Sequence, residues 1–295
     1  MVQTIGVVGL GIMGAPMAAK LVAAGYDVIG FNRSPGPMRS LEDAGGRAAG
    51  SAAALAREAE IVIMVLPDSP DVETVALGPD GLIANMLEGS LLIDCSTISP
   101  HVARAVASAA IAAGIEMVDA PVSGGETGAK EAKLSIMVGG SPSAFDRAHP
   151  ILRSLGTTVE HVGASGAGQT VKAANQLLVA GQLALVAEAI TLLQASEVDM
   201  DSGLRVLGGG LAASRVLAVK APAMLAHQFD PGFRIDLHCK DLGIVLDLAA
   251  RSGVELTVSP LVERMFSAAQ SDGLGALDHS AIIIPMLQGV RGGAR

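Results

Sequence analysis

The sequence predicts a doubly wound α/β domain with a mostly parallel sheet, followed by an all-helical domain. Short apolar, β-branched runs alternate with alanine-rich stretches in the first half, which is typical of strands joined by helical crossovers. A glycine-rich turn separates the first strand from the first helix. Beyond about residue 165, helical periodicity continues without a convincing strand.

Six strands are expected in the first half, because each run is short, rich in Val and Ile, and apolar along most of its length. They are Thr4–Gly9, Asp27–Phe31, Ile61–Leu66, Leu91–Asp94, Ile115–Asp119 and Ser135–Val138. Helices between them include Ala15–Ala24, Ser51–Ala59 and Pro100–Ala113. Continuous apolar character indicates strands that are covered on both faces, as in a parallel sheet.

A long helix opens the second half, from about Gln169 to about Glu197. Such a helix is roughly 40 Å long, and its apolar residues surround most of its circumference, which predicts burial on nearly all sides. Gln182 and Glu188 interrupt its apolar stretch, so we expect a buried helix and no membrane partner. We therefore expect two domains, residues 1–164 and residues 165–295.

Shorter helices are expected after this long one. They are Ser202–Gly208, Pro222–Ala226, Asp241–Ser252, Pro260–Asp272 and Ser280–Val290. Pro285 weakens the last of them, because proline disrupts the interior of a helix.

Composition excludes several classes of partner. The 295 residues carry 20 Lys+Arg against 29 Asp+Glu, a formal charge of −9, with one Tyr, five Phe and no Trp. Nucleic-acid binders rely on basic surfaces and stacking aromatic rings, so we expect no nucleic-acid partner. Cys95 and Cys239 cannot build a disulfide framework and lack the spacing of zinc ligands, so we expect no metal and a reduced, cytoplasmic compartment.

The glycine turn carries the first chemical signal. Gly9-Leu10-Gly11-Ile12-Met13-Gly14 directly follows the first strand and precedes the first helix. In that context Gly9 allows a tight turn, Gly11 lets a pyrophosphate approach the backbone, and Gly14 lets the helix pack on the strand. The helix N-terminus offers N–H groups and a partial positive charge to a phosphate. The whole motif predicts a dinucleotide-binding site.

The end of the second strand indicates which dinucleotide is bound. About 20 residues after the glycines, an NAD enzyme places an acid on the ribose 2′-hydroxyl. This chain has Asn32-Arg33-Ser34 there instead. Arg33 can pair with a 2′-phosphate and its two neighbours can add hydrogen bonds, so NADP(H) is favoured over NAD(H). The alternative for Arg33 is a solvated loop arginine.

Two further motifs suit a small carboxylate-bearing substrate. Ser123-Gly124-Gly125 follows a predicted strand, and its backbone N–H groups with the serine hydroxyl would form an anion cradle, although such a turn is often merely structural. Lys172 and Asn175 share one face at the start of the long helix. Apolar neighbours would desolvate the lysine, and burial lowers the pKa of a lysine toward neutrality, as acid–base catalysis requires. Lys240-Asp241 lies at a predicted helix entry, where Asp241 would cap the first turn.

Taken together, four motifs make the chain resemble the β-hydroxyacid dehydrogenase family over nearly its whole length. They are Gly9–Met17, Asp119–Gly125, Gly168–Gln176 and Lys240–Leu242. Within the family, the stretches Pro231–His238, Asp278–Ala281 and Gly125-Glu126 are most similar to the branch that reduces tartronate semialdehyde to glycerate.

The resemblance implies a role for each matched residue. Lys172 would be the catalytic acid/base, Asn175 would orient the substrate, and Ser123-Gly124-Gly125 would bind its carboxylate. Further residues would line the cofactor: Leu66, Pro67, Thr97 and Lys240. The family also implies a homodimer or homotetramer formed through the helical domain. Ala132-Lys133 departs from the Gly-Thr that relatives commonly carry, which bears on substrate preference.

Two other functions stay open at this point. The chain could act on 3-hydroxyisobutyrate, succinic semialdehyde or glyoxylate, because a methyl or hydroxyl difference changes binding in an apolar pocket by only about 1–3 kcal/mol. It could also be a catalytically silent dinucleotide sensor. The Lys172–Asn175 pair argues against the sensor, which needs only the glycine turn.

Overall fold

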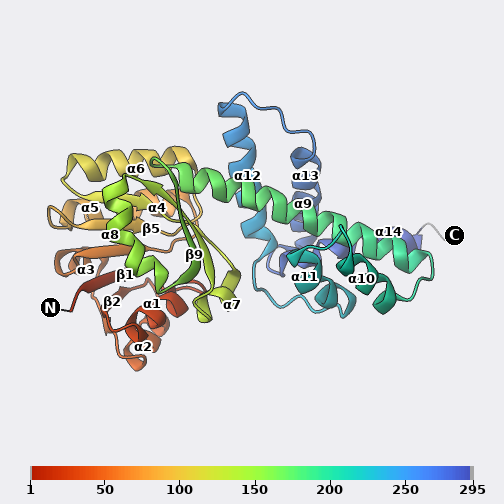
Figure 1. The fold of residues 1–295 in the computed structure, drawn as a ribbon, viewed down its shortest axis with the longest axis horizontal. Coiled ribbons are helices and arrows are strands. Elements are labelled where there is room, and N and C mark those ends of the chain that lie inside the picture. The colour runs from red at the N-terminus through yellow and green to blue at the C-terminus, as the bar shows by residue number, and fades with distance from the viewer. Residues whose placement is uncertain (1, 293–295) are drawn as a thin grey trace. The chain divides into compact units, whose positions relative to one another are not determined.

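The structure is a computed structural model that describes residues 2–292, and it divides into two compact units, Met1–Lys172 and Ala173–Arg295 (Figure 1). Within the described residues, the strands all lie in the first unit, and the second unit is built from helices. The predicted fold class, a mostly parallel α/β sheet followed by helices, is confirmed.

The sheet of the first unit has the order β3-β2-β1-β4-β5-β6-β8-β7, with β9 paired to β8. Strands β1 to β6 pair in parallel, whereas β8 runs antiparallel to β6 and β7. The strands are β1 (Thr4–Val8), β2 (Asp27–Phe31), β3 (Arg47–Ala48), β4 (Ile61–Met64), β5 (Leu91–Asp94), β6 (Glu116–Asp119), β7 (Val122–Ser123), β8 (Leu134–Gly140) and β9 (Gly156–Gly163). All six predicted strands are present, and β3, β7 and β9 are additional.

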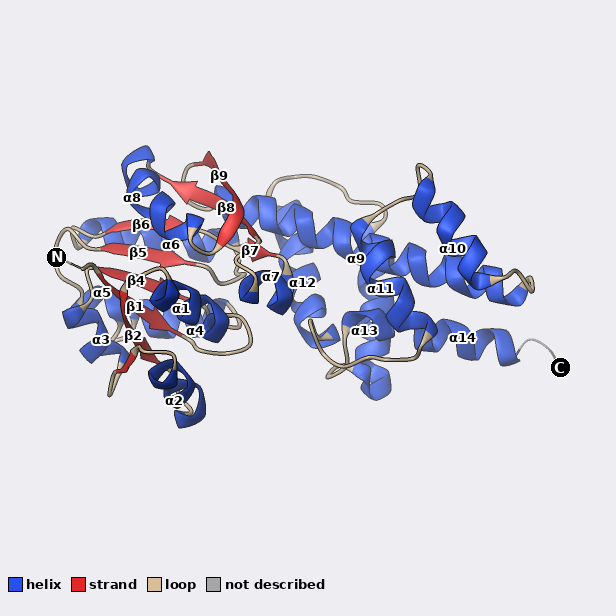
Figure 2. Cartoon of the chain, turned by 60° about the horizontal axis from the view of Figure 1, so that its bottom comes forward, coloured by secondary structure: helices blue, strands red, loops and turns tan. Residues whose placement is uncertain are grey.

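Helices cover both faces of this sheet (Figure 2). Alternate residues of the central strands pack into two hydrophobic cores, one on each face of the sheet. Ile61 and Ile63 belong to one core, and Val62 and Met64 belong to the other. The first core is closed by α1 (Gly14–Ala23), α2 (Pro35–Asp43), α7 (Gly125–Lys130) and α8 (Pro142–Arg153). The second is closed by α3 (Ala52–Glu58), α4 (Ser69–Leu77), α5 (Leu82–Asn85) and α6 (Pro100–Ala112). Burial on both faces explains why these strands are continuously apolar.

The long predicted helix is α9 (Ala167–Ala195), which begins in the first unit and continues into the second. One face packs into the core of the second unit, where Leu183 and Ile190 join Phe266. The opposite face exposes a stripe of leucines at seven-residue spacing, Leu178, Leu185 and Leu192, each about 60% exposed or more. The prediction of burial on nearly all sides was therefore wrong.

By length and composition alone, α9 is the one helix of the described residues that is apolar enough to cross a membrane. In its most apolar 18-residue window, 39% of the residues are buried inside the protein. One face of α9 packs in the hydrophobic core of the second unit, and a core helix of this kind passes the same length and composition test.

The remaining helices complete the second unit. They are α10 (Met200–Gly209), α11 (Arg215–Leu225), α12 (Ile235–Arg251), α13 (Ser259–Ala269), the π-helical turn η1 (Gln270–Leu274), the 3₁₀ turn η2 (His279–Ile282) and α14 (Ile283–Gly292). Because α12 begins at Ile235, Asp241 lies inside the helix, and the prediction that it caps a helix entry was wrong. Pro285 falls in the first turn of α14, where a missing N–H is tolerated.

Candidate cofactor and substrate site

The carboxyl ends of five neighbouring parallel strands meet along one edge of the sheet. Val8 of β1 lies beside Phe31 of β2 and Met64 of β4. Met64 lies beside Asp94 of β5, which in turn lies beside Asp119 of β6. In open α/β sheets, ligands bind outside these ends at the point where the strand order reverses. Here that point lies between β1 and β4.

The turn after β1 requires glycine at two positions and leaves space at a third. Gly9 has a φ of +93°, and a Cβ there would collide with the Val65 carbonyl oxygen. A Cβ on Gly14 would collide with the Gly9 carbonyl oxygen. A Cβ on Gly11 would meet nothing within 4 Å, so protein packing does not demand glycine at that position. The open space beside Gly11 is compatible with the close approach of a pyrophosphate to the backbone.

The N-terminus of α1 supports the same ligand. The helix begins at Gly14 after Met13, and no side chain caps its first turn. Uncapped N–H groups and the helix dipole suit a phosphate. Within the motif, Ile12 is exposed, whereas the Leu10 side chain is buried in the core of the sheet domain, so Leu10 offers only its backbone to a ligand.

The residues after β2 have different surroundings. Asn32 accepts a 3.1 Å hydrogen bond from the Leu10 backbone N–H, and its amide donates to the Ser34 hydroxyl at 2.8 Å. Asn32 therefore ties the end of β2 to the glycine turn. Arg33 is exposed and forms no ion pair with any residue that the structure describes. It is a cation available at the end of β2, beside the glycine turn.

Leu66 and Pro67 follow β4, next to the segment that follows β5. The Leu66 backbone N–H donates to the Ser96 hydroxyl at 2.9 Å, and the Ser96 backbone N–H donates to the buried Asp94 carboxylate at 3.0 Å. These bonds join the loops after β4 and β5 into one wall of the site. Pro67 is exposed and Leu66 is half-buried on that wall.

The two residues that flank Thr97 are both hydrogen-bonded to one buried glutamine of α9. Gln169 accepts a hydrogen bond from the Ile98 backbone N–H at 3.1 Å and donates to the Ser96 carbonyl oxygen at 2.8 Å. Both ends of its side-chain amide are used, and its exposed fraction is 1%. Gln169 thus fixes the first turns of α9 against the loop that carries Thr97.

Asp119 at the end of β6 anchors the start of α9. Its carboxylate accepts backbone hydrogen bonds from Gly166 at 2.7 Å and from Gln169 at 2.9 Å. Burial raises the pKa of Asp119 to about 6, although these two N–H groups act in the opposite direction. The motif around Asp119 therefore sets where α9 begins.

The predicted anion cradle lies at the end of β7. Ser123 is half-buried, and Gly124 and Gly125 are exposed with φ of +140° and +63°. These backbone conformations favour glycine, because a Cβ is strained in them. The conformation is compatible with the predicted carboxylate cradle.

Lys172 lies beside this cradle. Its side chain is buried, with 6% exposed, and Nζ donates a 2.8 Å hydrogen bond to the carbonyl oxygen of Val122, the residue before Ser123. The structure thus brings together two of the predicted features, the lysine of α9 and the Ser123-Gly124-Gly125 loop. A buried ammonium next to an open glycine loop can deliver a proton to a ligand held there.

Asn175 and Lys240 belong to the second unit. Asn175 follows Lys172 by three positions along α9, which places both on one side of the helix. Its amide donates to the Gln176 side-chain oxygen at 2.8 Å. Lys240 of α12 lies 3.0 Å from the carboxylate of Asp241, with 17% of its side chain exposed. These two contacts lie within the second unit.

Several buried polar residues of the site were not predicted, among them Ser96, Gln169 and Gln176. The two glutamines form, with Lys172, a buried polar line along α9, at spacings of three and four residues. That line was visible in the sequence and indicates a functional helix face. Ser96 gave no comparable signal, because its role depends on which loops the sheet order places side by side.

Comparison with known families covers almost the whole chain. Residues 4–163 match the model described as the NAD binding domain of 6-phosphogluconate dehydrogenase. Residues 166–286 match the model described as NAD-binding of NADP-dependent 3-hydroxyisobutyrate dehydrogenase.

Individual relatives match over similar lengths. The chain is 37% identical over 280 residues to 2-hydroxy-3-oxopropionate reductase of Escherichia coli K12, covering 95% of each chain. It is 39% identical over 283 residues to 3-hydroxyisobutyrate dehydrogenase of Pseudomonas aeruginosa, covering 93% of this chain and 95% of the relative. A solved structure of Mycobacterium tuberculosis 3-hydroxyisobutyrate dehydrogenase with L-serine superposes with a TM-score of 0.89 at 34% identity, covering 97% of this chain and 99% of that one.

Proposed function

The chain belongs to the β-hydroxyacid dehydrogenase family and is an NAD(P)-dependent oxidoreductase, and from this premise we propose that it reduces tartronate semialdehyde to glycerate with NADPH. The observation that carries the proposal is the buried Lys172 ammonium, held next to the Ser123-Gly124-Gly125 loop. A proton donor and a carboxylate cradle are the two groups that reduction of a small aldehyde acid requires from the protein.

We assign cofactor binding to the edge of the sheet. The glycine turn and the N-terminus of α1 would hold the pyrophosphate, with Leu66, Pro67 and Thr97 alongside. Arg33 would pair with the 2′-phosphate, and Asn32 and Ser34 would keep the turn in shape, which favours NADPH over NADH. Lys240 would contact the same cofactor from α12. When bound, the cofactor supplies a hydride to the carbonyl carbon.

The protein residues then complete the reduction. The backbone N–H groups of Ser123-Gly124-Gly125 would hold the substrate carboxylate and thereby position the aldehyde. As the carbonyl oxygen gains negative charge, the Lys172 ammonium would donate its proton to that oxygen and leave a hydroxyl group. In the reverse direction the neutral amine would remove the same proton. Asn175, one turn further along α9, would orient the substrate.

Each domain has its own task in this proposal. Residues 1–164 would form the NADP-binding domain and residues 165–295 the helical substrate and oligomerisation domain. The exposed leucines of α9, Leu178, Leu185 and Leu192, would pair with a second copy of the chain in a homodimer or homotetramer. Both cysteines are free thiols, as expected for a cytoplasmic enzyme.

A second candidate function is favoured by one of the same comparisons. The 39% identity to a 3-hydroxyisobutyrate dehydrogenase supports oxidation of that hydroxy acid by the same Lys172 chemistry. Succinic semialdehyde and glyoxylate would use the same carboxylate cradle. A silent dinucleotide sensor has no need of a buried lysine beside an anion cradle, so it is the least favoured of these candidate functions.

A substrate panel tests the proposal. NADPH oxidation is followed with tartronate semialdehyde, succinic semialdehyde, methylmalonate semialdehyde and glyoxylate, and each assay is repeated with NADH. We expect the highest kcat/KM for tartronate semialdehyde with NADPH. A preference for another aldehyde would keep the chemistry and replace the substrate, whereas no turnover of any of them with NADPH bound would refute the proposed function.

A further inference from the structure

A chain of buried polar groups in the second unit ends at Asn175. The Gln176 side chain stands in its middle, with 5% exposed. Its nitrogen donates to the Asp241 carboxylate at 2.6 Å, and its oxygen accepts from the Asn175 amide at 2.8 Å. Asp241 is itself 2% exposed and lies within ion-pair distance of Lys240, at 3.0 Å.

The chemistry of Asp241 determines the direction of every bond in this chain. A carboxylate only accepts hydrogen bonds, so the nitrogen of Gln176 must face it. The Gln176 oxygen must then face Asn175, which can meet it only with its own NH₂ group. The Asn175 carbonyl oxygen is consequently turned away from Gln176. The buried carboxylate of Asp241 thus sets the orientation of the Asn175 amide through Gln176, which lies between them.

A second branch fixes the backbone at the same position. His238 of α12 has its Nε2 3.3 Å from the Gln176 carbonyl oxygen and its Nδ1 3.1 Å from Nδ1 of His279. A carbonyl oxygen only accepts, so His238 carries its proton on Nε2 and accepts at Nδ1. His279 must then donate from its own Nδ1. Gln176 is therefore held through its side chain by Asp241 and through its backbone by His238.

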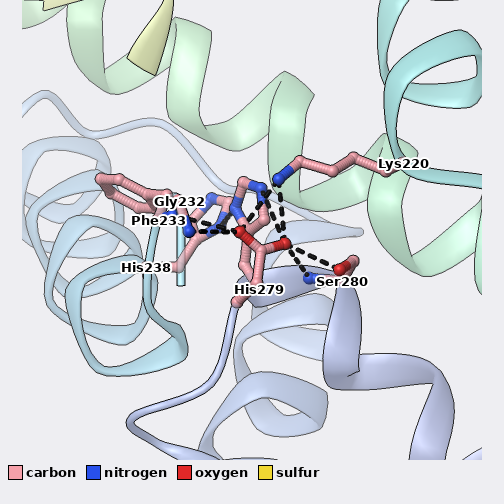
Figure 3. A network of polar contacts seen from close by, with 7 residues as sticks. Lys220, Gly232, Phe233, His238, His279 and Ser280 are labelled. Carbon is pink, nitrogen blue, oxygen red and sulfur yellow. Dashed lines mark hydrogen bonds and ion pairs between the residues drawn. The ribbon is translucent and has the colours of Figure 1, made fainter. Parts of the chain in front are cut away.

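The histidine branch is itself anchored by a partly buried ion pair (Figure 3). Asp278 accepts hydrogen bonds from the Lys220 ammonium at 2.9 and 3.0 Å, and from the Ser280 hydroxyl at 2.7 Å. It also accepts from the backbone N–H groups of Gly232 and Phe233. These contacts use both of the sequence stretches, Pro231–His238 and Asp278–Ala281, that had no assigned role. They join three separate segments of the second unit.

We propose that Asp241, acting through Gln176, is a positioning residue that presents the Asn175 carbonyl oxygen, and not its NH₂ group, to the substrate. This inference rests on the proposed function, because it takes Asn175 as a substrate-contacting group. An amide presented in this way accepts a hydrogen bond. It therefore pairs with a hydroxyl or ammonium hydrogen and disfavours a second acceptor in its place.

The fixed orientation has a consequence for catalysis. An unanchored Asn amide can present either end, and its NH₂ end would offer no acceptor to the 2-hydroxyl group of the proposed substrate. Anchoring by a buried carboxylate removes that freedom before the substrate arrives, which lowers the cost of reaching the transition state. Asp241 and Gln176 touch neither substrate nor cofactor in this role.

A double-mutant cycle that moves the carboxylate from position 241 to position 176 tests the proposal. In Gln176→Glu, two carboxylates face each other, so the Asn175 anchor is lost, and we expect kcat/KM for the aldehyde to fall about tenfold or more. Asp241→Asn can either accept from or donate to Gln176, so it no longer forces one orientation on that amide, and we expect a partial loss of kcat/KM of about threefold. In the double variant, Asn at 241 donates to Glu at 176, which again accepts from Asn175. We expect kcat/KM to return to the Asp241→Asn value.

Controls separate positioning from folding. Gln182→Glu adds the same charge to α9 outside the network and should leave kcat/KM unchanged. The free energy of unfolding in urea is measured for every variant. Recovery of stability without recovery of kcat/KM in the double variant would overturn the proposal, as would wild-type kcat/KM in Gln176→Glu. If Gln176→Glu does not fold, Gln176→Met replaces it and is expected to show the same loss of kcat/KM, and wild-type kcat/KM in that variant would overturn the proposal.

A spectroscopic measurement keeps this test independent of the proposed function. In protein labelled with ¹⁵N at asparagine, the Asn175 NH₂ protons should exchange slowly with solvent in the wild type and rapidly in Gln176→Met. Equal exchange in both proteins would overturn the relay. Absence of aldehyde turnover by the wild type would instead refute the proposed function, and the relay would then be decided by proton exchange alone.

Discussion

The Lys172 ammonium donates a 2.8 Å hydrogen bond to the carbonyl oxygen of Val122, one residue before the Ser123-Gly124-Gly125 loop. This contact links the start of α9 to the strand that ends in the proposed carboxylate cradle. Asp119 and Gln169 fix the same end of α9, through bonds from the Gly166 and Gln169 N–H groups to Asp119 and from Gln169 to the loop after β5. The position of Lys172 is therefore determined by contacts within the first unit.

Arg33 is predicted to select NADPH. Arg33→Asp should lower kcat/KM for NADPH about ten- to hundredfold, because a charge-assisted hydrogen bond to phosphate contributes about 1.5–3 kcal/mol, and it should affect NADH far less. Steady-state kinetics with both cofactors measures the ratio. Arg205→Asp, the same charge change on α10, serves as the control. An unchanged NADPH/NADH ratio in the Arg33 variant would remove this residue from the 2′-phosphate.

Ala132→Gly is predicted to stabilise the protein. Ala132 follows α7 with a φ of +55°, and its N–H and that of Lys133 bond back to the carbonyl oxygens of Ala129 and Gly128. This helix ending prefers glycine at the left-handed position. Relief of roughly 1–2 kcal/mol of strain, less the greater entropy of unfolded glycine, gives an expected gain of about 0.5–1 kcal/mol.

Urea unfolding of Ala132→Gly checks this gain, with Ala213→Gly in an exposed turn as the control. An Ala132 variant that is no more stable than the wild type would contradict it. The exposed side chain of Lys133, the second residue of the Ala132-Lys133 departure from relatives, pairs with Glu131 at 2.9 Å.

The buried His279 predicts acid destabilisation. Burial lowers the pKa of His279, and the neighbouring His238 of α12 and Lys220 of α11 act in the same direction, against Asp278. A histidine with a lowered pKa binds fewer protons when folded than when unfolded. The free energy of unfolding should therefore fall as pH drops below about 6.5, with this residue contributing at most about 1.4 kcal/mol per pH unit.

His279→Asn tests this pH dependence, because an asparagine NH₂ group can replace the Nδ1 donor without titrating. We expect the variant to show a shallower loss of stability between neutral pH and the acid range in urea unfolding. His227→Asn, at an exposed site with a φ of +52° that asparagine tolerates, is the control. Equal slopes in wild type and His279→Asn would show that another group controls acid unfolding.

The leucine stripe of α9 is predicted to join copies of the chain. Leu185, with 65% exposed, lies in the middle of the stripe, so Leu185→Glu should bury a charge in the contact and shift the protein to monomers. Sedimentation velocity measures the distribution. Val206→Glu on α10, a side chain that is 75% exposed, provides the matched control. A wild type that sediments as a monomer at all concentrations would refute this oligomer.

Local patterns were sufficient to predict the central strands and the glycine turn. Strands such as Ile61–Met64 are covered on both faces, so they appear as unbroken apolar runs. The strand Gly156–Gly163 was missed because it has glycine at both ends and exposed polar residues between, and it gains its partner only through pairing with β8. Its formation depends on tertiary context that a local window does not contain.

The site was predictable where chemistry is local and not where it depends on packing. Lys172 and the Ser123 loop could be identified separately, but their contact through Val122 follows from the antiparallel return of β7 and β8. Asp241 was assigned a capping role because the start of α12 was placed too late. Its contact with Gln176, 65 residues earlier in the sequence, required the fold of the second unit.

Lys172→Met tests the central claim most directly. NADPH oxidation with tartronate semialdehyde is measured for wild type and variant in parallel, and NADPH binding is measured by fluorescence. We predict that the variant binds NADPH like the wild type but loses about 10²- to 10⁴-fold in kcat, because the proton donor is absent. Wild-type kcat in a folded, NADPH-binding Lys172→Met protein would contradict the acid/base assignment.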